Sequence, residues 1–433
     1  MILHMSDVFL NDKEFHMSQP NAPQVTVVGG GMITQVQVLP SLYALQREGL
    51  IGDISVCALN GAPLKVLAED ETLRKAFPGQ TFTPHPDFKT VDPDEKFPHL
   101  FEEVAAKMPP RNILFVAMPD QLHYHAIKVG LEAGQHVISV KPLVLDYKQA
   151  VEIEKLALEK GLFVGVEYHK RFDDRALMAR DQYRAGRFGE FRLAQASLVE
   201  PYYYRDSNFM NWCTCENSDM FTYVGCHYVD QVHFITGLMP VEVSVYGIRD
   251  KYPNGNEGFL WTDGRVLWSN GACLSVIDAM GYPNIAPGGN MQGLKMLCQG
   301  AEDACLVFHE DQYRGVKYSY NDDAMDEKYY HEPSPDYFKL LYRGGKGLDP
   351  VGYGFRSIEA LVKTIRRVDA AGDDVDARRA VIQEIDGEGV IATPANSSYN
   401  ELVIEAGRLS ILNDGRPAVI EYGDNPRVFL KEY

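Results

Sequence analysis

The pattern of apolar and polar positions divides the chain into two parts. Up to about residue 170, short apolar runs alternate with segments of helical periodicity. Short apolar runs bounded by turn residues are typical of buried strands, and strands that alternate with helices predict a parallel, doubly wound sheet. The expected strands are residues 24–28, 53–59, 112–117, 135–140 and 162–166, and the expected helices are residues 32–45, 63–77, 121–133 and 146–160.

From about residue 190 the pattern changes to longer runs with alternating apolar positions. Turn-rich pieces such as Thr262-Asp-Gly264 and Pro287-Gly-Gly-Asn290 separate these runs. We therefore expect a second, mainly antiparallel open sheet, so that the whole chain is of the α/β class. The expected strands are 191–199, 241–248, 266–268, 272–277 and 294–298, and the expected helices are 223–236, which Gly237 ends, 353–371 and 397–413.

Three glycines, Gly29, Gly30 and Gly31, lie between the first expected strand and the helix that begins at Met32 and Ile33. Gly29 permits a tight turn, and Gly31 lets the backbone approach a pyrophosphate that binds the free N–H groups of the helix N-terminus. Thr34 takes the third glycine position of the G-x-G-x-x-G motif, so the motif is imperfect. A turn without a ligand is the alternative interpretation of these glycines alone.

Residues at the ends of four expected strands support a dinucleotide site. Because ligands bind beyond the carboxyl ends of parallel strands, Gly29, Asn60, Pro119 and Lys141 should line one crevice. The second strand ends without a carboxylate for ribose hydroxyls and without an adjacent arginine for a 2′-phosphate, so NAD and NADP both remain open. The candidate cofactor contacts are Gly29, Gly30, Gly31, Met32, Ile33, Asn60, Met118, Pro119, Asp120 and Lys141.

Composition excludes several classes of partner. The formal charge of −18 argues against nucleic acid or an anionic membrane as a partner, whereas a dinucleotide would meet local backbone amides. The seven cysteines are scattered and odd in number, which favours a reducing compartment. We see no secretory signal and no apolar run near the roughly 20 residues of a membrane helix, so we expect a soluble, cytoplasmic protein.

Two polar positions carry the candidate chemistry. Lys141 follows a strand and precedes Pro142, which directs it into the crevice, where it could bind or deprotonate a substrate hydroxyl. His227 and Asp230 share one helical face, and an imidazole can accept a proton near neutral pH. The alternatives are a solvated lysine at a domain edge and a structural histidine.

Other chemistries have little support in the sequence. The residues Cys213, Cys215, Cys226 and His227 do not follow a strong zinc pattern, so we expect no metal. A G-x-S-x-G elbow and a Walker lysine are both missing, so the serine hydrolase and nucleoside triphosphatase classes have no support.

Five motifs together resemble the glucose–fructose oxidoreductase / inositol dehydrogenase / MocA family (Gfo/Idh/MocA). They run in order from about residue 24 to residue 240. The matching pieces are Val28-Gly-Gly-Gly31, Pro119-Asp-Gln-Leu-His123, Ala133-Gly-Gln-His-Val-Ile-Ser-Val-Lys141-Pro142, Lys170-Arg-Phe172 and Gly225-Cys-His227-Tyr-Val-Asp230.

The resemblance implies a dinucleotide-binding Rossmann domain at 23–142 and a substrate-binding and oligomerisation domain at 143–433, after an N-terminal extension at 1–22. It implies NAD or NADP as cofactor, oxidation of a hydroxyl of a sugar, polyol or glycoside, and a homo-oligomer, either dimer or tetramer. It makes Lys141 the motif lysine, His227 the catalytic base and His123 a further cofactor contact. The substrate-contact candidates are Tyr168, His169, Lys170, Arg171 and Asp230.

Two positions depart from the family pattern. Val140 replaces the motif glutamate before Lys141, and Tyr223 replaces the aspartate four residues before His227. Tyr223 could still donate a hydrogen bond as the third catalytic residue, and Asp219 is a possible substitute for the carboxylate. Two alternative functions remain: an NAD-dependent glycosidase that works by transient oxidation and elimination, and a sensor that binds dinucleotide or sugar without turnover.

Overall fold

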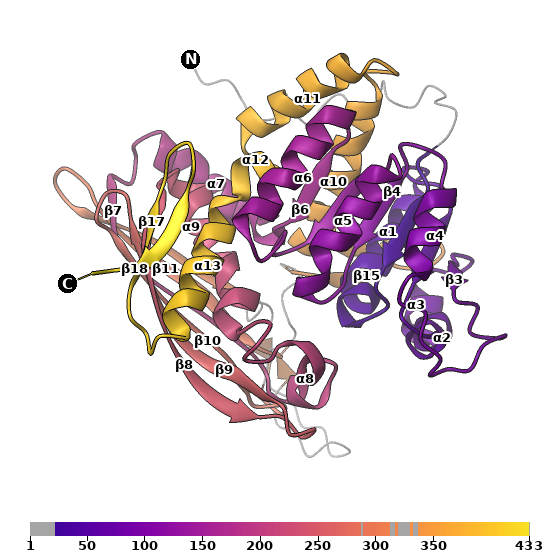
Figure 1. Cartoon of the computed structure of the whole chain (residues 1–433), viewed down its shortest axis with the longest axis horizontal. Coiled ribbons are helices and arrows are strands. Elements are labelled where there is room, and N and C mark those ends of the chain that lie inside the picture. The colour runs from indigo at the N-terminus through magenta and orange to yellow at the C-terminus, as the bar shows by residue number, and fades with distance from the viewer. Residues whose placement is uncertain (1–21, 287–288, 312–316, 319–329, 332–336, 433) are drawn as a thin grey trace.

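The computed structural model describes residues 22–286, 289–311, 317–318, 330–331 and 337–432. It contains a six-stranded sheet and an eight-stranded sheet, each covered by helices (Figure 1). The extension expected at 1–22 lies, except for residue 22, outside the described residues, as does part of the turn expected at 287–290.

The six-stranded sheet is parallel throughout, as expected, in the order β3-β2-β1-β4-β5-β6. The order reverses between β1 and β4, and ligands bind at such a switch point in doubly wound folds. The short edge strand β3, which contains Pro84, was not expected. The strands are β1 (Val25–Val28), β2 (Ile54–Cys57), β3 (Thr83–His85), β4 (Ile113–Val116), β5 (His136–Val140) and β6 (Val164–Glu167).

Two helices replace the single helix expected at 63–77. Asp70 has an extended backbone and accepts a hydrogen bond from the backbone N–H of Leu73 at 3.0 Å, so it caps a new helix instead of continuing the old one. The helices of this unit are α1 (Leu39–Arg47), which follows the π-helical segment η2 (Thr34–Val38), α2 (Gly61–Glu69), α3 (Glu71–Ala76), α4 (Leu100–Lys107), η3 (Asp120–Leu122), α5 (His123–Glu132) and α6 (Tyr147–Lys160).

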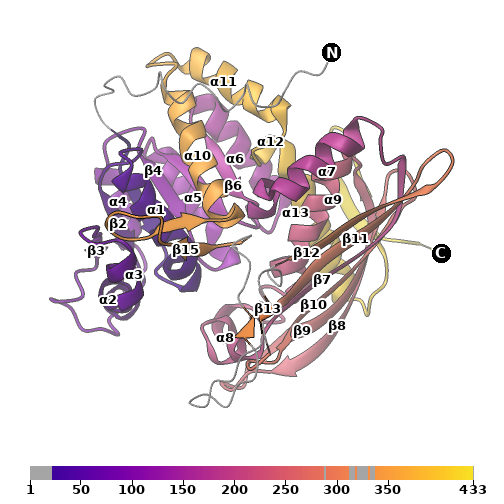
Figure 2. The same cartoon turned by 180° about the vertical axis from the view of Figure 1, so that it is seen from behind.

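Helices from the C-terminal part of the chain return to this first sheet. The apolar face of α10 (Tyr353–Asp369) and residues of α11 (Val375–Glu388) share one buried cluster with β1 and β4 (Figure 2). Leu361 lies so close to Gly165 of β6 that a Cβ there would meet it at 2.4 Å. The six-stranded unit therefore extends beyond residue 142, because β6, α10 and α11 belong to its core.

The eight-stranded sheet has the order β12-β11-β7-β10-β9-β8-β17-β18. It is antiparallel except where β7 pairs with β10, which confirms the expected mainly antiparallel sheet. The turn expected at Thr262-Asp-Gly264 is wrong, because these residues lie inside β9. The strands are β7 (Glu190–Pro201), β8 (Pro240–Lys251), β9 (Glu257–Trp268), β10 (Cys273–Tyr282), β11 (Met291–Gln299), β12 (Ala304–Asp311), β17 (Ala418–Glu421) and β18 (Arg427–Leu430).

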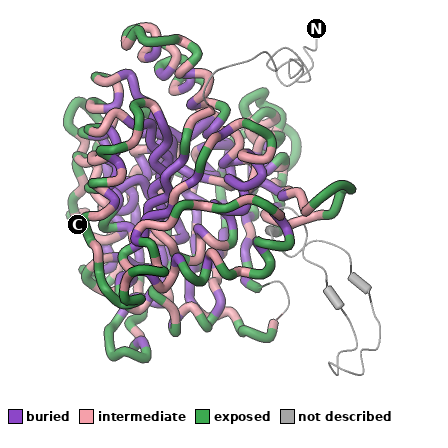
Figure 3. The backbone as a smooth tube through the Cα atoms, turned by 90° about the vertical axis from the view of Figure 1, so that its right-hand side faces the viewer, coloured by how far each residue is buried: buried purple, intermediate pink, exposed green. Residues whose placement is uncertain are grey.

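Helices cover one face of this sheet (Figure 1), and the helices and the sheet form the second large core, which belongs to the buried interior shown in purple in Figure 3. The expected helix at 223–236 is divided into the π-helical segment η6 (Phe221–Gly225) and α9 (Cys226–Thr236), which Gly237 ends with a φ of 75°. The other helices of this part are η4 (His169–Phe172), α7 (Asp174–Arg184), η5 (Tyr202–Asp206), α8 (Phe209–Trp212), α12 (Pro394–Ser397) and α13 (Tyr399–Ile411). Two small antiparallel sheets of the described residues pair β13 (Lys317–Tyr318) with β14 (Tyr330–His331) and β15 (Lys339–Leu341) with β16 (Asp349–Val351).

None of the helices in the described ranges is long and apolar enough to cross a membrane.

Candidate active site

The glycine turn lies where the strand order of the first sheet reverses. A Cβ on Gly29, whose φ is +121°, would lie 1.9 Å from the carbonyl oxygen of Ala117, so only glycine fits there. Gly31 is exposed, and a Cβ there would meet no atom within 4 Å, which leaves room beside the free N–H groups of Met32 and Ile33. Thr34 stands at the third glycine position of the motif, and its hydroxyl donates a hydrogen bond to the Gly29 carbonyl at 2.6 Å. The turn therefore fits a dinucleotide pyrophosphate.

The other strand-end residues divide into exposed and buried groups. Asn60, Met118 and Pro119 are partly exposed at the ends of β2 and β4, where a ribose or nicotinamide would lie. Asp120 is buried and accepts a hydrogen bond from Ser218 at 3.0 Å, and burial raises its pKa.

His123 is fully buried, and each of its ring nitrogens lies 2.8 Å from a backbone carbonyl oxygen, one of Met118 and one of Pro142. It therefore ties the loop after β4 to the loop after β5. For Asp120 and His123 this placement favours a positioning role in place of the expected direct cofactor contact.

Lys141 connects the two halves of the molecule. It lies at the end of β5 with only 9% of its surface exposed. Its Nζ donates a hydrogen bond to the backbone carbonyl of Tyr223 in η6 and lies 3.9 Å from the centroid of the Tyr223 ring. The alternative of a solvated lysine at a domain edge is therefore wrong.

His227 lies on the first turn of α9 and is 5% exposed. Its Nδ1 is buried and has no hydrogen-bond partner among the described residues. Burial is the main cause that lowers the pKa of His227 well below its usual value, and the positive charges of Lys141, His169 and Lys170 add to it. His227 is therefore a neutral imidazole at neutral pH, able to accept a proton.

Tyr223 occupies the position at which the family motif has an aspartate, four residues before His227. Burial raises the pKa of Tyr223 well above its usual value, so Tyr223 stays neutral and can donate a hydrogen bond. Asp219, the expected substitute, is engaged elsewhere, because it accepts hydrogen bonds from the backbone of Thr222 at 2.8 Å and from Arg408 at 3.1 Å.

Asp278 on β10 is a carboxyl group that the sequence reasoning missed. It is fully buried, neither of its oxygens has a partner among the described residues, and burial raises its pKa well above the usual value. A Cβ on Gly225 would meet Asp278 Oδ2 at 2.7 Å, which explains the glycine of the G-x-H-x-x-D motif. The available signal was a lone acid between the apolar residues Ile277 and Ala279.

Three of the five substrate-contact candidates face the core. The Arg171 guanidinium donates to both carboxylate oxygens of Asp230, at 2.8 and 2.6 Å, and the Tyr399 hydroxyl donates to the same carboxylate at 2.8 Å. The hydroxyl of Tyr168 accepts a hydrogen bond from Asn400 at 2.9 Å. We therefore propose positioning roles for Tyr168, Arg171 and Asp230 in place of the expected substrate contact.

His169 and Lys170 lie beside His227. The ring centroids of His169 and His227 are 4.6 Å apart. Lys170 Nζ donates to Gln292 Oε1 at 2.6 Å. The rings of Tyr337 and Tyr353 contact the His169 ring at centroid distances of 5.4 and 5.5 Å. Sequence reasoning missed Gln292, Tyr337 and Tyr353, because nothing local in the chain distinguishes them.

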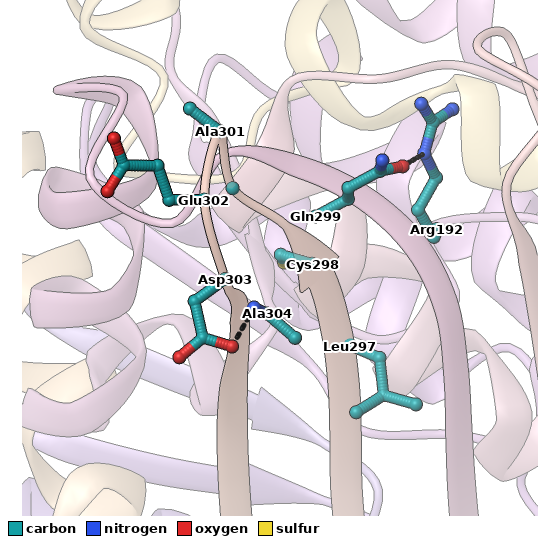
Figure 4. Close-up of a pocket in the computed structure, with 9 residues that line it drawn as sticks. Arg192, Leu297, Cys298, Gln299, Ala301, Glu302, Asp303 and Ala304 are labelled. Carbon is teal, nitrogen blue, oxygen red and sulfur yellow. Dashed lines mark hydrogen bonds between the residues drawn. The ribbon is translucent and has the colours of Figure 1, made fainter.

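One pocket of the described structure contains none of the candidate residues. It lies at the hairpin between β11 and β12, where Arg192 donates to Gln299 at 3.0 Å (Figure 4).

The described residues also contain no group of three or more histidine, cysteine, aspartate or glutamate side chains that could hold a metal ion. Burial raises the pKa of the Cys226 thiol to about 12, so this cysteine stays protonated.

Comparison with known proteins defines the class of the first sheet. Residues 24–168 match the family GFO_IDH_MocA, described as "Oxidoreductase family, NAD-binding Rossmann fold". The six-stranded unit thus matches an NAD-binding Rossmann fold, which confirms the expected dinucleotide cofactor. Residues 24–168 thus match the model of the Gfo/Idh/MocA family, which the motifs resemble.

Curated relatives match part of the chain. An uncharacterized oxidoreductase, YfiI, of Bacillus subtilis is 34% identical over 39% of this chain and 39% of its own length. The scyllo-inositol 2-dehydrogenase (NADP(+)) IolW of the same organism is 26% identical over 44% of this chain and 52% of its own length. The chain therefore spans about half or less of the length of these relatives.

Solved structures match nearly the whole fold. GenD2 from gentamicin A biosynthesis, in complex with NAD, has a TM-score of 0.62 at 16% identity, over 94% of this chain and 98% of its own. The myo-inositol 2-dehydrogenase from Lactobacillus plantarum has a TM-score of 0.61 at 16% identity, over 93% of this chain and all of its own. At this identity the match shows the fold alone.

Proposed function

We propose that this protein is an NAD(P)-dependent dehydrogenase that oxidises a hydroxyl of a sugar, polyol or glycoside. The observation that carries the proposal is the convergence of Lys141, from the end of β5, with η6 and α9, which hold Tyr223 and His227. Relatives named as inositol and D-glucoside dehydrogenases support the substrate class.

The cofactor would be held by the glycine turn at 29–31 and by Asn60, Met118 and Pro119. When bound, a nicotinamide dinucleotide supplies a hydride acceptor for the carbinol carbon. The exposed position of Gly31 gives a pyrophosphate access to the backbone at the helix start.

Lys141 binds and polarises the substrate hydroxyl. Its ammonium group is pre-positioned by the carbonyl and the ring of Tyr223, so it can stabilise the negative charge that develops on the oxygen as the proton leaves. His227 accepts that proton because it is neutral at neutral pH. Tyr223 keeps its proton and serves as a hydrogen-bond donor.

The proposal is tested by incubating the protein with NAD or NADP and a panel of myo-inositol, scyllo-inositol and methyl glucosides. Reduced nicotinamide is followed by absorbance, and products are followed by mass spectrometry. We expect net reduced cofactor and a keto product in equal amounts. Aglycone release without net reduction would instead indicate the glycosidase, and dinucleotide binding without either product would indicate the sensor.

Lys141→Met and His227→Gln should each lower kcat at least about 100-fold. Matched controls are Lys128→Met and His125→Gln, whose side chains are exposed and pair with surface glutamates. Unchanged kcat in both active-site variants would contradict the assigned roles.

We also propose that the protein is a homo-oligomer that uses the open face of the eight-stranded sheet. Leu193, Leu297 and Leu306 lie directly opposite one another on β7, β11 and β12, and each is about half exposed. Such a row of exposed leucines on a sheet face is typical of a protein interface.

A further inference from the structure

The end of β6 holds a buried carboxylate that three elements orient. Glu167 is 3% exposed and is the last residue of β6. Its Oε1 accepts hydrogen bonds from Gln37 of η2 at 2.9 Å and from Ser357 of α10 at 2.5 Å. Because two donors occupy Oε1, the carboxylate directs Oε2 towards a third group.

Gln37 is itself held in place. Its side-chain amide also donates to the Gly354 carbonyl at 3.0 Å, and its Oε1 accepts a hydrogen bond from Tyr337 at 2.7 Å. The carboxylate of Glu167 is therefore part of a hydrogen-bond network that joins η2, α10 and Tyr337. A network that is fully hydrogen-bonded in this way restricts the side chain to one orientation.

The third group is the imidazole of His169. Its Nδ1 lies 3.1 Å from Glu167 Oε2, and because a carboxylate only accepts, Nδ1 must carry the proton. The Nε2 atom is thereby left as an acceptor, and no partner of it is found in the described part of the chain. The rings of Tyr337 and Tyr353 pack against the same imidazole, and 12% of its side chain is exposed.

The two neighbouring histidines differ in a way that matters for proton transfer. Among the described residues no carboxylate orients His227, its Nδ1 has no hydrogen-bond partner, and burial lowers its pKa and so disfavours its protonated form. His169 lies against it at a centroid distance of 4.6 Å, and the Glu167 carboxylate lies 3.1 Å from its Nδ1. A carboxylate in this position both fixes the tautomer and stabilises the charged ring.

We propose that His169 takes over the substrate proton from His227 and passes it to solvent, with Glu167 as the positioning residue. This inference rests on the proposed dehydrogenase function. In the step, the N–H bond formed on His227 breaks and an N–H bond forms at His169 Nε2, either directly or through one water. No electrons are exchanged, and the Glu167 carboxylate balances the charge until the proton leaves.

The first test does not depend on turnover. Nitrogen NMR of the histidine-labelled protein reports which ring nitrogen carries the proton, and the signal of His169 is identified by its loss in His169→Gln. We expect the Nδ1–H tautomer in the wild type and a loss of this preference in Glu167→Gln. The control is the exposed pair of His125 and Glu102, whose variant Glu102→Gln should leave His169 unchanged. An Nε2–H tautomer in the wild type would overturn the proposal.

The second test uses chemical rescue with the fastest substrate of the inositol and glucoside panel. His169→Ala should lower kcat on the order of 100-fold at low buffer, with KM and dinucleotide binding little changed. Added imidazole should restore much of this rate in His169→Ala and none of it in His227→Gln. His125→Ala should show neither loss nor rescue.

The outcomes separate the two proposals. If His227→Gln loses activity while His169→Ala keeps full kcat at low buffer, the proton transfer through His169 is wrong and the dehydrogenase function stands. If the wild type turns over no member of the panel but binds dinucleotide, the proposed function fails, and the transfer fails with it.

Discussion

The two sheets of this protein differ in how their faces are covered, and the difference separates their tasks. The parallel sheet is covered on both faces, and its strands apart from the edge strand β3 are almost fully buried, so it offers ligands only its strand ends. The eight-stranded sheet is covered on one face, and its other face exposes large apolar residues such as Tyr246 and Ile248. We infer that the first sheet binds the cofactor through its backbone, whereas the second supports substrate binding and association.

The largest effect on stability is expected at the buried ion pair of Arg171 and Asp230. Asp230→Asn removes the charge that the buried Arg171 guanidinium requires and should lower the free energy of unfolding by about 3–5 kcal/mol. Chemical denaturation measures this loss. Glu421→Gln, which removes one partner of an exposed ion pair with Arg427, is the control and should change stability by less than about 1 kcal/mol. A similarly small change in Asp230→Asn would show that the buried ion pair does not stabilise the fold.

The next effect is expected at the glycine turn. Gly29→Ala places a Cβ 1.9 Å from the Ala117 carbonyl, so β1 and β4 must separate, and we expect a loss of about 3 kcal/mol or more. Gly79 also has a positive φ, but a Cβ there meets no atom within 4 Å, so Gly79→Ala isolates the backbone strain. Equal losses in the two variants, measured by thermal unfolding, would argue against the close approach at Gly29.

A smaller effect is expected from pH. Burial lowers the pKa of His233 to about 4, below its value in an unfolded chain. A histidine of this kind contributes stability that is present above pH about 6.5 and is lost as the pH falls towards 4, here about 3 kcal/mol. His233→Gln should therefore flatten the decline in stability between these two pH values, whereas His125→Gln should not. An unchanged pH profile in His233→Gln would contradict the assignment.

The smallest effect on the fold is expected at the open sheet face. Leu306→Glu should convert the proposed oligomer to a smaller species in light scattering, with little change in unfolding temperature. Val66→Glu is the matched control, because Val66 on α2 is equally exposed, at 57% against 58% for Leu306. If Leu306→Glu leaves the molar mass unchanged, the interface lies elsewhere or the protein is a monomer.

The sequence predicted the elements whose signals are local. The buried strands from β1 to β6, except β3, and the glycine turn follow from apolar runs and from Gly29 to Gly31. The division of the helix at Asp70 was missed, although an aspartate can cap a helix, because the apolar periodicity continues through it. The strand β9 was only partly predicted, because Asp263 and Gly264 resemble a turn. In the structure a Cβ on Gly264 would lie 2.7 Å from the Phe221 ring, so this glycine makes room for the ring.

The candidate site was predicted less completely than the fold. Lys141 and His227 follow motifs, but the roles of Arg171 and Asp230 depend on one another and on Tyr399, which is distant in sequence. The support of Glu167 comes from Gln37 and Ser357, at separations of 130 and 190 residues. Contacts of this range leave no periodic pattern in the chain, so only the structure reveals them.

The central claim is that the glycine turn holds the dinucleotide while Lys141 serves the substrate. The most direct measurement is calorimetric titration of NAD and NADP into the wild type, Gly31→Val and Lys141→Met. We predict that Gly31→Val folds normally, because a side chain there meets open space, yet binds the dinucleotide at least about tenfold more weakly by blocking the approach of the pyrophosphate. Lys141→Met should bind within about threefold of the wild type and still fail to turn over substrate. Wild-type affinity in Gly31→Val would contradict the account.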